Sequence, residues 1–120
     1  MHNMDPYFDE IIKRSNLTKL QALAICSLIP NVDRFFDYSE INEFKSKPSG
    51  EASTIRRQAR NNIMESLYTF VLGFYAGFLK KEYVLNLLEV ADSIKRLSEE
   101  GIYSDQALEN LDKIIRAMLI

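Results

Sequence analysis

Five basic residues lie within sixteen consecutive positions near the middle of the chain, accompanied by a single acidic residue, Glu51. They are Lys45, Lys47, Arg56, Arg57 and Arg60. This stretch carries a net charge of +4, so the rest of the chain carries −6, because the total is −2. Concentrated cations attract phosphates and release their counterions. The pattern therefore predicts nucleic-acid binding that weakens as the salt concentration rises.

The polar side chains around these cations are of types that contact bases and phosphates. Arginine, glutamine and asparagine form hydrogen bonds with base edges, and hydroxyl groups near a helix start contact a phosphate beside the helix N-terminus. The predicted nucleic-acid-binding residues are Lys45, Lys47, Ser53, Thr54, Arg56, Arg57, Gln58, Arg60 and Asn61. The alternative is an ordinary solvated helix face, or arginines that pair with acidic neighbours inside the fold.

The elements that would position this cluster are those of a helix-turn-helix. Ser39 is expected to cap a short supporting helix that reaches Ser46, and Lys47–Gly50 is the clearest break in the chain. The second helix is expected to begin between Glu51 and Ser53 and to present its first turns to DNA, as recognition helices do. The break is longer than the three or four residues usual for the motif.

The remaining pattern is also helical, because apolar residues recur every three or four positions. Asp5 and Pro6 are typical of a helix N-cap and first position, and Gly101 is typical of a helix end. The expected helices cover about residues 6–15, 18–29, 39–46, 53–79, 83–97 and 105–118. A chain of 120 residues fits one domain. We therefore predict an all-α, single-domain bundle of about five to six helices over residues 1–120.

One segment leaves an alternative open. Residues 67–85 are rich in Tyr, Phe and Val, which also suit strands, and Ala76-Gly77 could form a hairpin turn. A hairpin after a helix-turn-helix would make the fold a winged helix. The helical interpretation is preferred because the periodicity is maintained through the segment.

The same region predicts self-association. Ser66–Leu79 contains no charged residue, and Gly73 and Gly77 stand four positions apart, a spacing that lets another helix approach closely. The predicted dimer interface comprises Phe70, Gly73, Phe74, Gly77, Phe78, Ile115 and Met118. The alternative is a central helix buried in its own fold. A two-fold dimer would place two recognition helices about one DNA turn apart.

Groups for catalysis or metal binding are scarce. The chain has one histidine, His2, and one cysteine, Cys26, and its four glycines match no phosphate-binding loop. We therefore expect no enzymatic activity, cofactor, metal site or small-molecule substrate. The longest uncharged run, 14 residues, is shorter than the about 20 needed to span a membrane. With no signal-peptide pattern and no disulfide framework, a cytoplasmic location is expected.

Together these features predict a DNA-binding helix-turn-helix regulator or accessory protein that acts as a homodimer on double-stranded DNA. The alternative is a non-catalytic helical adaptor or small subunit of a larger protein or nucleoprotein assembly.

Overall fold

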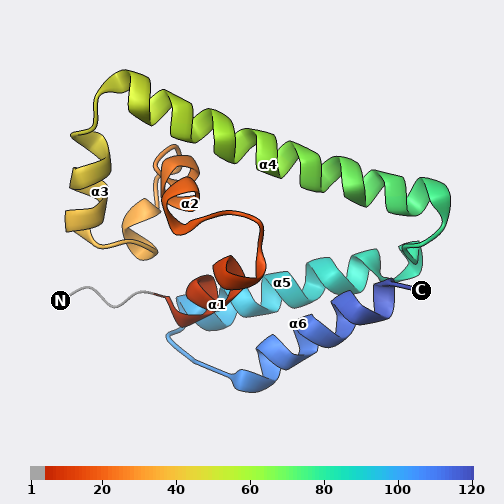
Figure 1. Ribbon diagram of the computed structural model, residues 1–120. Helices are drawn as coiled ribbons and strands as arrows, with labels where there is room; N and C mark the ends of the chain where they lie inside the picture. Colours follow the sequence, from red (N-terminus) through yellow and green to blue (C-terminus); the bar gives the residue numbers. More distant parts are fainter. Residues whose placement is uncertain (1–4) are drawn as a thin grey trace. The chain divides into compact units, whose positions relative to one another are not determined.

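The computed structural model describes residues 5–120, which form six α-helices, two short 3-10 helices and no strand other than an isolated bridge (Figure 1). The predicted all-α fold with five to six helices is confirmed. The contacts divide the chain into an N-terminal unit that ends at Ser66 and a C-terminal unit, Leu67–Ile120. The longest helix, α4, contributes residues to both units.

The N-terminal unit is built from four helices. They are α1 (Pro6–Arg14), α2 (Lys19–Cys26), α3 (Tyr38–Lys45) and the first part of α4 (Ser49–Ala76), with a 3-10 helix, η1 (Val32–Arg34), between α2 and α3. The Asp5 carboxylate caps α1 by accepting hydrogen bonds from the backbone amides of Tyr7 (2.9 Å) and Phe8 (3.2 Å). Such caps satisfy amides that have no partner within the helix.

Two further helix starts in this unit have reciprocal side-chain caps. At α2, the Thr18 hydroxyl accepts from the Gln21 amide, and the Gln21 side chain accepts from the Thr18 amide, both at 3.1 Å. At α3, the Glu40 carboxylate accepts from the Asp37 amide at 3.1 Å. The predicted Ser39 cap is therefore wrong. Asp37 is the N-cap, because its backbone is extended and the helical conformation begins directly after it.

A single hydrophobic core holds these helices together. Its buried residues come from α2, α3, α4 and the segment before α3: Ala22, Leu23, Ala24, Phe36, Ile41, Phe44, Ala52 and Ile55. Phe36 is fully buried, and the half-buried Phe8 ring stacks on Phe35 (4.3 Å between centroids) and meets Phe36 edge-on (5.5 Å). Aromatic rings stabilise a core through such offset and edge contacts in addition to their buried area.

The C-terminal unit consists of the end of α4, a 3-10 helix η2 (Lys81–Tyr83), α5 (Val84–Glu99) and α6 (Asp105–Met118). Helices α5 and α6 contact each other extensively. The expected helix end at Gly101 is confirmed, since this residue takes a left-handed backbone (φ 72°), which glycine adopts without a steric penalty. Ser104 then caps α6 by accepting a hydrogen bond from the Ala107 amide (3.3 Å).

The winged-helix alternative does not describe the segment 67–85. Residues 67–76 continue α4, and residues 84 and 85 begin α5. The helix ends at Ala76, before the predicted Leu79, because Gly77 adopts a left-handed backbone (φ 90°). After this turn, Leu79 forms an isolated antiparallel bridge with Leu119, and the Lys80 amide donates to the Met118 carbonyl at 2.8 Å.

Within residues 5–120, no helix is both long and apolar enough to cross a bilayer. His2 lies outside the described residues.

Candidate nucleic-acid interface

The predicted basic cluster lies on α3, on the first half of α4 and on the connection between them. Helix α3 ends at Lys45 and α4 begins at Ser49, so the connection is Ser46–Pro48. The predicted break, Lys47–Gly50, was placed too late, because Pro48 immediately precedes the helix and its carbonyl already accepts from the Ala52 amide (3.1 Å). The connection of three residues matches the length usual for a helix-turn-helix.

The first half of α4 has one buried face and one exposed face. Ala52, Ile55 and Ala59, spaced by three and four residues, are buried. The opposite face is exposed and carries Ser53, Arg57, Arg60 and Asn61, here called the α4 polar face. Ser53, Arg57 and Asn61 form a row at intervals of four, and Arg60 lies three positions after Arg57, so these side chains project from one broad side of the helix.

The two arginines of the α4 polar face form no ion pair with any residue from 5 to 120. Among the described residues, no carboxylate lies within salt-bridge distance of Arg57 or Arg60, nor of the exposed Lys45 at the end of α3. The alternative in which some arginines of the cluster pair with acidic neighbours is therefore not the arrangement of Arg57 and Arg60. An unpaired exposed guanidinium retains its hydrogen-bond donors for an external anion.

Arg56 differs from its neighbours because it packs against the core of the N-terminal unit. Its guanidinium lies over the Phe44 ring (5.4 Å to the centroid) and its Nη2 is 3.5 Å from the Ser27 hydroxyl. Its Nε atom is buried and has no hydrogen-bond partner in residues 5–120. The structure thus places Arg56 beside the core, where it helps to hold α4 against α2 and α3.

Three other predicted residues are also set apart from the α4 polar face. Lys47 forms an ion pair with Glu51 (3.4 Å), so the two charges largely cancel. The Thr54 hydroxyl donates to the Gly50 carbonyl within α4 (2.9 Å). Gln58 is exposed, but it follows Arg57 directly and so projects from the helix about 100° away from it.

Several hydrogen bonds hold α4 in place just after the α4 polar face. The Asn62 side-chain amide donates to the Gln21 side chain (3.0 Å) and to the Asn16 carbonyl (3.3 Å), and the Ser66 hydroxyl lies 3.0 Å from the Asn16 side chain. Helix α4 is thereby tied to the start of α2 as well as to the core. A rigid support of this kind holds recognition side chains in place before a ligand arrives.

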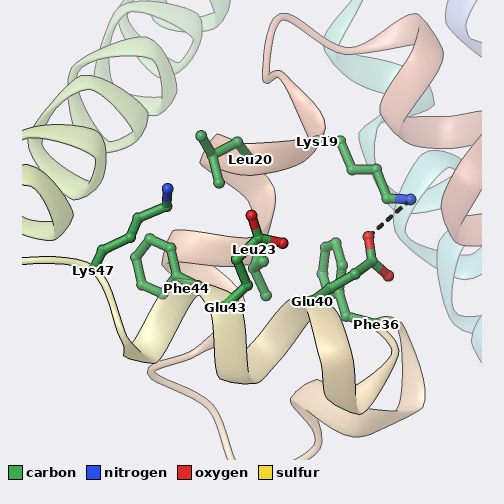
Figure 2. A pocket seen from close by; sticks show the side chains of 8 residues that line it. All are labelled: Lys19, Leu20, Leu23, Phe36, Glu40, Glu43, Phe44 and Lys47. Atoms are coloured by element: carbon green, nitrogen blue, oxygen red, sulfur yellow. Dashed lines mark ion pairs between the residues drawn. The ribbon is translucent and has the colours of Figure 1, made fainter.

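An open groove of about 300 Å³ lies between α2 and α3 in the same unit. Figure 2 shows the apolar side chains of Leu20, Leu23, Phe36 and Phe44 between Lys19 and Lys47. Lys19 forms an ion pair with Glu40 at 3.1 Å. The charged lining residues are Lys19, Lys47, Glu40 and Glu43, which carry no net charge. The groove therefore offers a phosphate no electrostatic attraction.

No set of three or more His, Cys, Asp or Glu residues within the described part of the chain is arranged to hold a metal ion. Cys26 is half-buried, and burial raises the pKa of its thiol because desolvation disfavours the thiolate. A raised pKa reduces the thiolate fraction, which is the reactive form.

Most of the predicted dimer residues are packed within the C-terminal unit. Gly73 is buried with the Leu79 side chain against it, and Met118 is 3% exposed. Gly77 forms the turn after α4, and a Cβ at this position would meet open space among the described residues. The aromatic residues Phe70, Phe74 and Phe78 are half-buried, and Ile115 is exposed.

Within the chain, the Leu79 side chain occupies the space beside Gly73, so the close approach of a second helix at the two glycines stays a prediction. The large apolar residues that are exposed on this part of α4 lie outside the predicted dimer interface: Leu67, Tyr68, Val71, Leu72 and Tyr75. Their apolar types were visible in the sequence, but burial decides which side of an apolar helix stays exposed.

Comparison with models of protein families, with curated proteins and with solved structures finds no match to this chain.

Proposed function

We propose that the N-terminal unit binds double-stranded DNA through the α4 polar face, and that the protein is a helix-turn-helix regulator or accessory protein acting as a homodimer. The observation that carries the proposal is the pair Arg57 and Arg60. Both are exposed and without an ion-pair partner among the described residues, on the side of α4 opposite the buried Ala52, Ile55 and Ala59.

The local geometry supports this assignment. Helix α3, a connection of three residues and α4 follow one another as the two helices of the motif do. Arg57 and Asn61, one turn apart, are of the types that form paired hydrogen bonds with guanine and adenine edges in the major groove. Arg60 and Lys45 supply charge suited to the flanking phosphates.

A homodimer fits this function because two copies related by a two-fold axis read a symmetric DNA site. A specific observation also supports self-association. Five large apolar residues of α4 in the C-terminal unit are more than half exposed. The same observation favours the second candidate function, a non-catalytic adaptor or small subunit of a larger assembly, in which another protein would cover these residues.

The test compares wild-type protein with Arg57→Ala/Arg60→Ala by fluorescence anisotropy on a random-sequence DNA duplex over a series of salt concentrations. We expect at least about a tenfold loss of affinity, and a salt slope lower by about one for each lost phosphate contact. The control is Lys95→Ala/Lys113→Ala, which removes the same charge from exposed positions of α5 and α6.

The proposal fails if the wild-type protein shows no salt-sensitive binding to the duplex, or if both double variants weaken binding equally. Equal weakening would mean that total charge, and not the α4 polar face, determines affinity. Stronger binding to an RNA duplex than to DNA would contradict the assignment to DNA.

A further inference from the structure

The C-terminal half of α4 exposes one continuous apolar surface. Its residues, here called the α4 apolar face, are Leu67 (59% exposed), Tyr68 (72%), Val71 (61%), Leu72 (53%) and Tyr75 (90%). All of them belong to the C-terminal unit. No charged residue occurs between Glu65 and Lys80, so the surface lacks the charged side chains that are typical of a helix face in contact with water.

The spacing of these residues suits packing against another helix. Leu67, Val71 and Tyr75 form a row at intervals of four, and Tyr68 and Leu72 form a second row beside it. Rows at intervals of four are the ridges that interdigitate in the commonest class of helix–helix packing, which requires the same kind of ridge on both helices. A second copy of α4 has the same rows of residues and therefore supplies the matching ridge.

The size of the surface also matches a dimer. At about 180 Å² for a fully exposed large side chain, the five residues present about 600 Å². This lies at the upper end of the largest apolar patches on monomeric proteins and supplies most of the about 800 Å² that each partner buries in a standard interface. Leu85 and Leu88 of α5, 71% and 60% exposed, add apolar area in the same unit.

The α4 apolar face carries no charge that would indicate a basic or an acidic partner. A basic or acidic partner would be matched by opposite charges within the surface, and the α4 apolar face contains none. An uncharged, ridged surface is complementary to itself, which is the requirement for a contact across a two-fold axis.

We infer that a second copy of this chain covers the α4 apolar face in a symmetric α4–α4 contact. The contact uses the side of α4 opposite Gly73, and so differs from the glycine-centred interface that the sequence predicted. It rests on the homodimer in the proposed function and gives that dimer its surface, but it does not depend on DNA binding.

The test measures molar mass by size-exclusion chromatography with light scattering, in the absence of nucleic acid. We expect a dimer for the wild-type protein at about 50 μM and a monomer for Leu67→Glu/Val71→Glu, because two carboxylates in each copy would be buried without partners. The matched control is Leu28→Glu, a leucine of similar exposure (54%) in the N-terminal unit, which should remain dimeric.

Three results would overturn the inference: a monomeric wild-type protein at about 50 μM, a dimer that persists in Leu67→Glu/Val71→Glu, or a Leu28→Glu variant that also dissociates. The wild-type measurement keeps the inference testable even if the double variant misfolds, which circular dichroism would reveal. Arg57→Ala/Arg60→Ala should remain dimeric, so loss of DNA binding and loss of the dimer can be told apart.

Discussion

The two units of this chain differ in how completely they bury their apolar residues. Among residues 5–66, ten hydrophobic residues of the N-terminal unit are buried: Tyr7, Ala22, Leu23, Ala24, Phe36, Ile41, Phe44, Ala52, Ile55 and Ala59. In the C-terminal unit, which is only slightly shorter, three are buried: Ile94, Leu108 and Met118. The first unit therefore has a closed core, whereas the second buries few of its large apolar side chains completely and leaves many of them exposed.

This difference follows from the number of elements that surround each core. In the N-terminal unit, residues from α2, α3, α4 and the segment before α3 converge on one cluster. In the C-terminal unit, α5 and α6 pack mainly on each other, and the main other element that contacts both is the short η2, which covers little of their apolar surface. The difference supports the proposal that a second copy of the chain covers part of the C-terminal unit.

Phe36→Ala should have the largest effect on stability and tests the closed core of the N-terminal unit. Phe36 is fully buried, so its removal is expected to lower the free energy of unfolding by about 3–5 kcal/mol through lost burial and a cavity. Urea unfolding followed by circular dichroism measures the change. Tyr38→Ala, at a position that is 66% exposed, should cost less than about 1 kcal/mol. Similar values for the two variants would contradict a closed core in the N-terminal unit.

Two glycines of α4 allow a matched comparison of the units. In the C-terminal unit, a Cβ on Gly73 would collide with the Leu79 side chain, so Gly73→Ala should lower the unfolding free energy by about 1–3 kcal/mol. In the N-terminal unit, Gly50 has open space around it, so Gly50→Ala should raise stability by up to about 0.5 kcal/mol.

Thermal unfolding measures both changes. The melting temperature should fall for Gly73→Ala and rise for Gly50→Ala. A neutral Gly73→Ala would show that the turn from α4 to Leu79 is loosely packed, and the C-terminal unit would then be even less complete than its burial indicates.

Alanine variants of Arg56 and Arg57 test how far the core of the N-terminal unit extends along α4. Of the three comparisons, this one should show the smallest difference in the free energy of unfolding. Arg56→Ala should lower the unfolding free energy by about 1 kcal/mol, because it removes the contact with Phe44 and the packing of the side-chain stem. Arg57→Ala should change it by less than about 0.5 kcal/mol, because that side chain is exposed. Urea titrations of both variants give the comparison, which fails if the order is reversed.

Much of the fold was predictable because it depends on local signals. The cap at Asp5 and the stop at Gly101 act within a few residues, and both are found in the structure. The end of α4 was misplaced because Phe78 continues the apolar period, whereas the backbone conformation of Gly77, which ends the helix, is not encoded by periodicity.

The candidate site was predictable only as a set of residue types. The sequence placed nine residues together, but their division into exposed and packed members depends on which side of α4 meets the core. Arg56 and Arg57 are adjacent and chemically identical, yet one lies against Phe44 and the other is exposed. A helix rotates by about 100° per residue, so neighbours in sequence face different surroundings once the helix is packed.

The sequence by itself determined that this protein is helical, that its positive charge is concentrated between Lys45 and Arg60, and that an uncharged stretch follows. These properties depend on residue types and spacing along one chain. Only the tertiary structure decided which side of α4 is buried in each unit, since burial depends on the elements that pack against the helix. That packing leaves Arg57 and Arg60 unpaired in one unit and Leu67, Val71 and Tyr75 uncovered in the other.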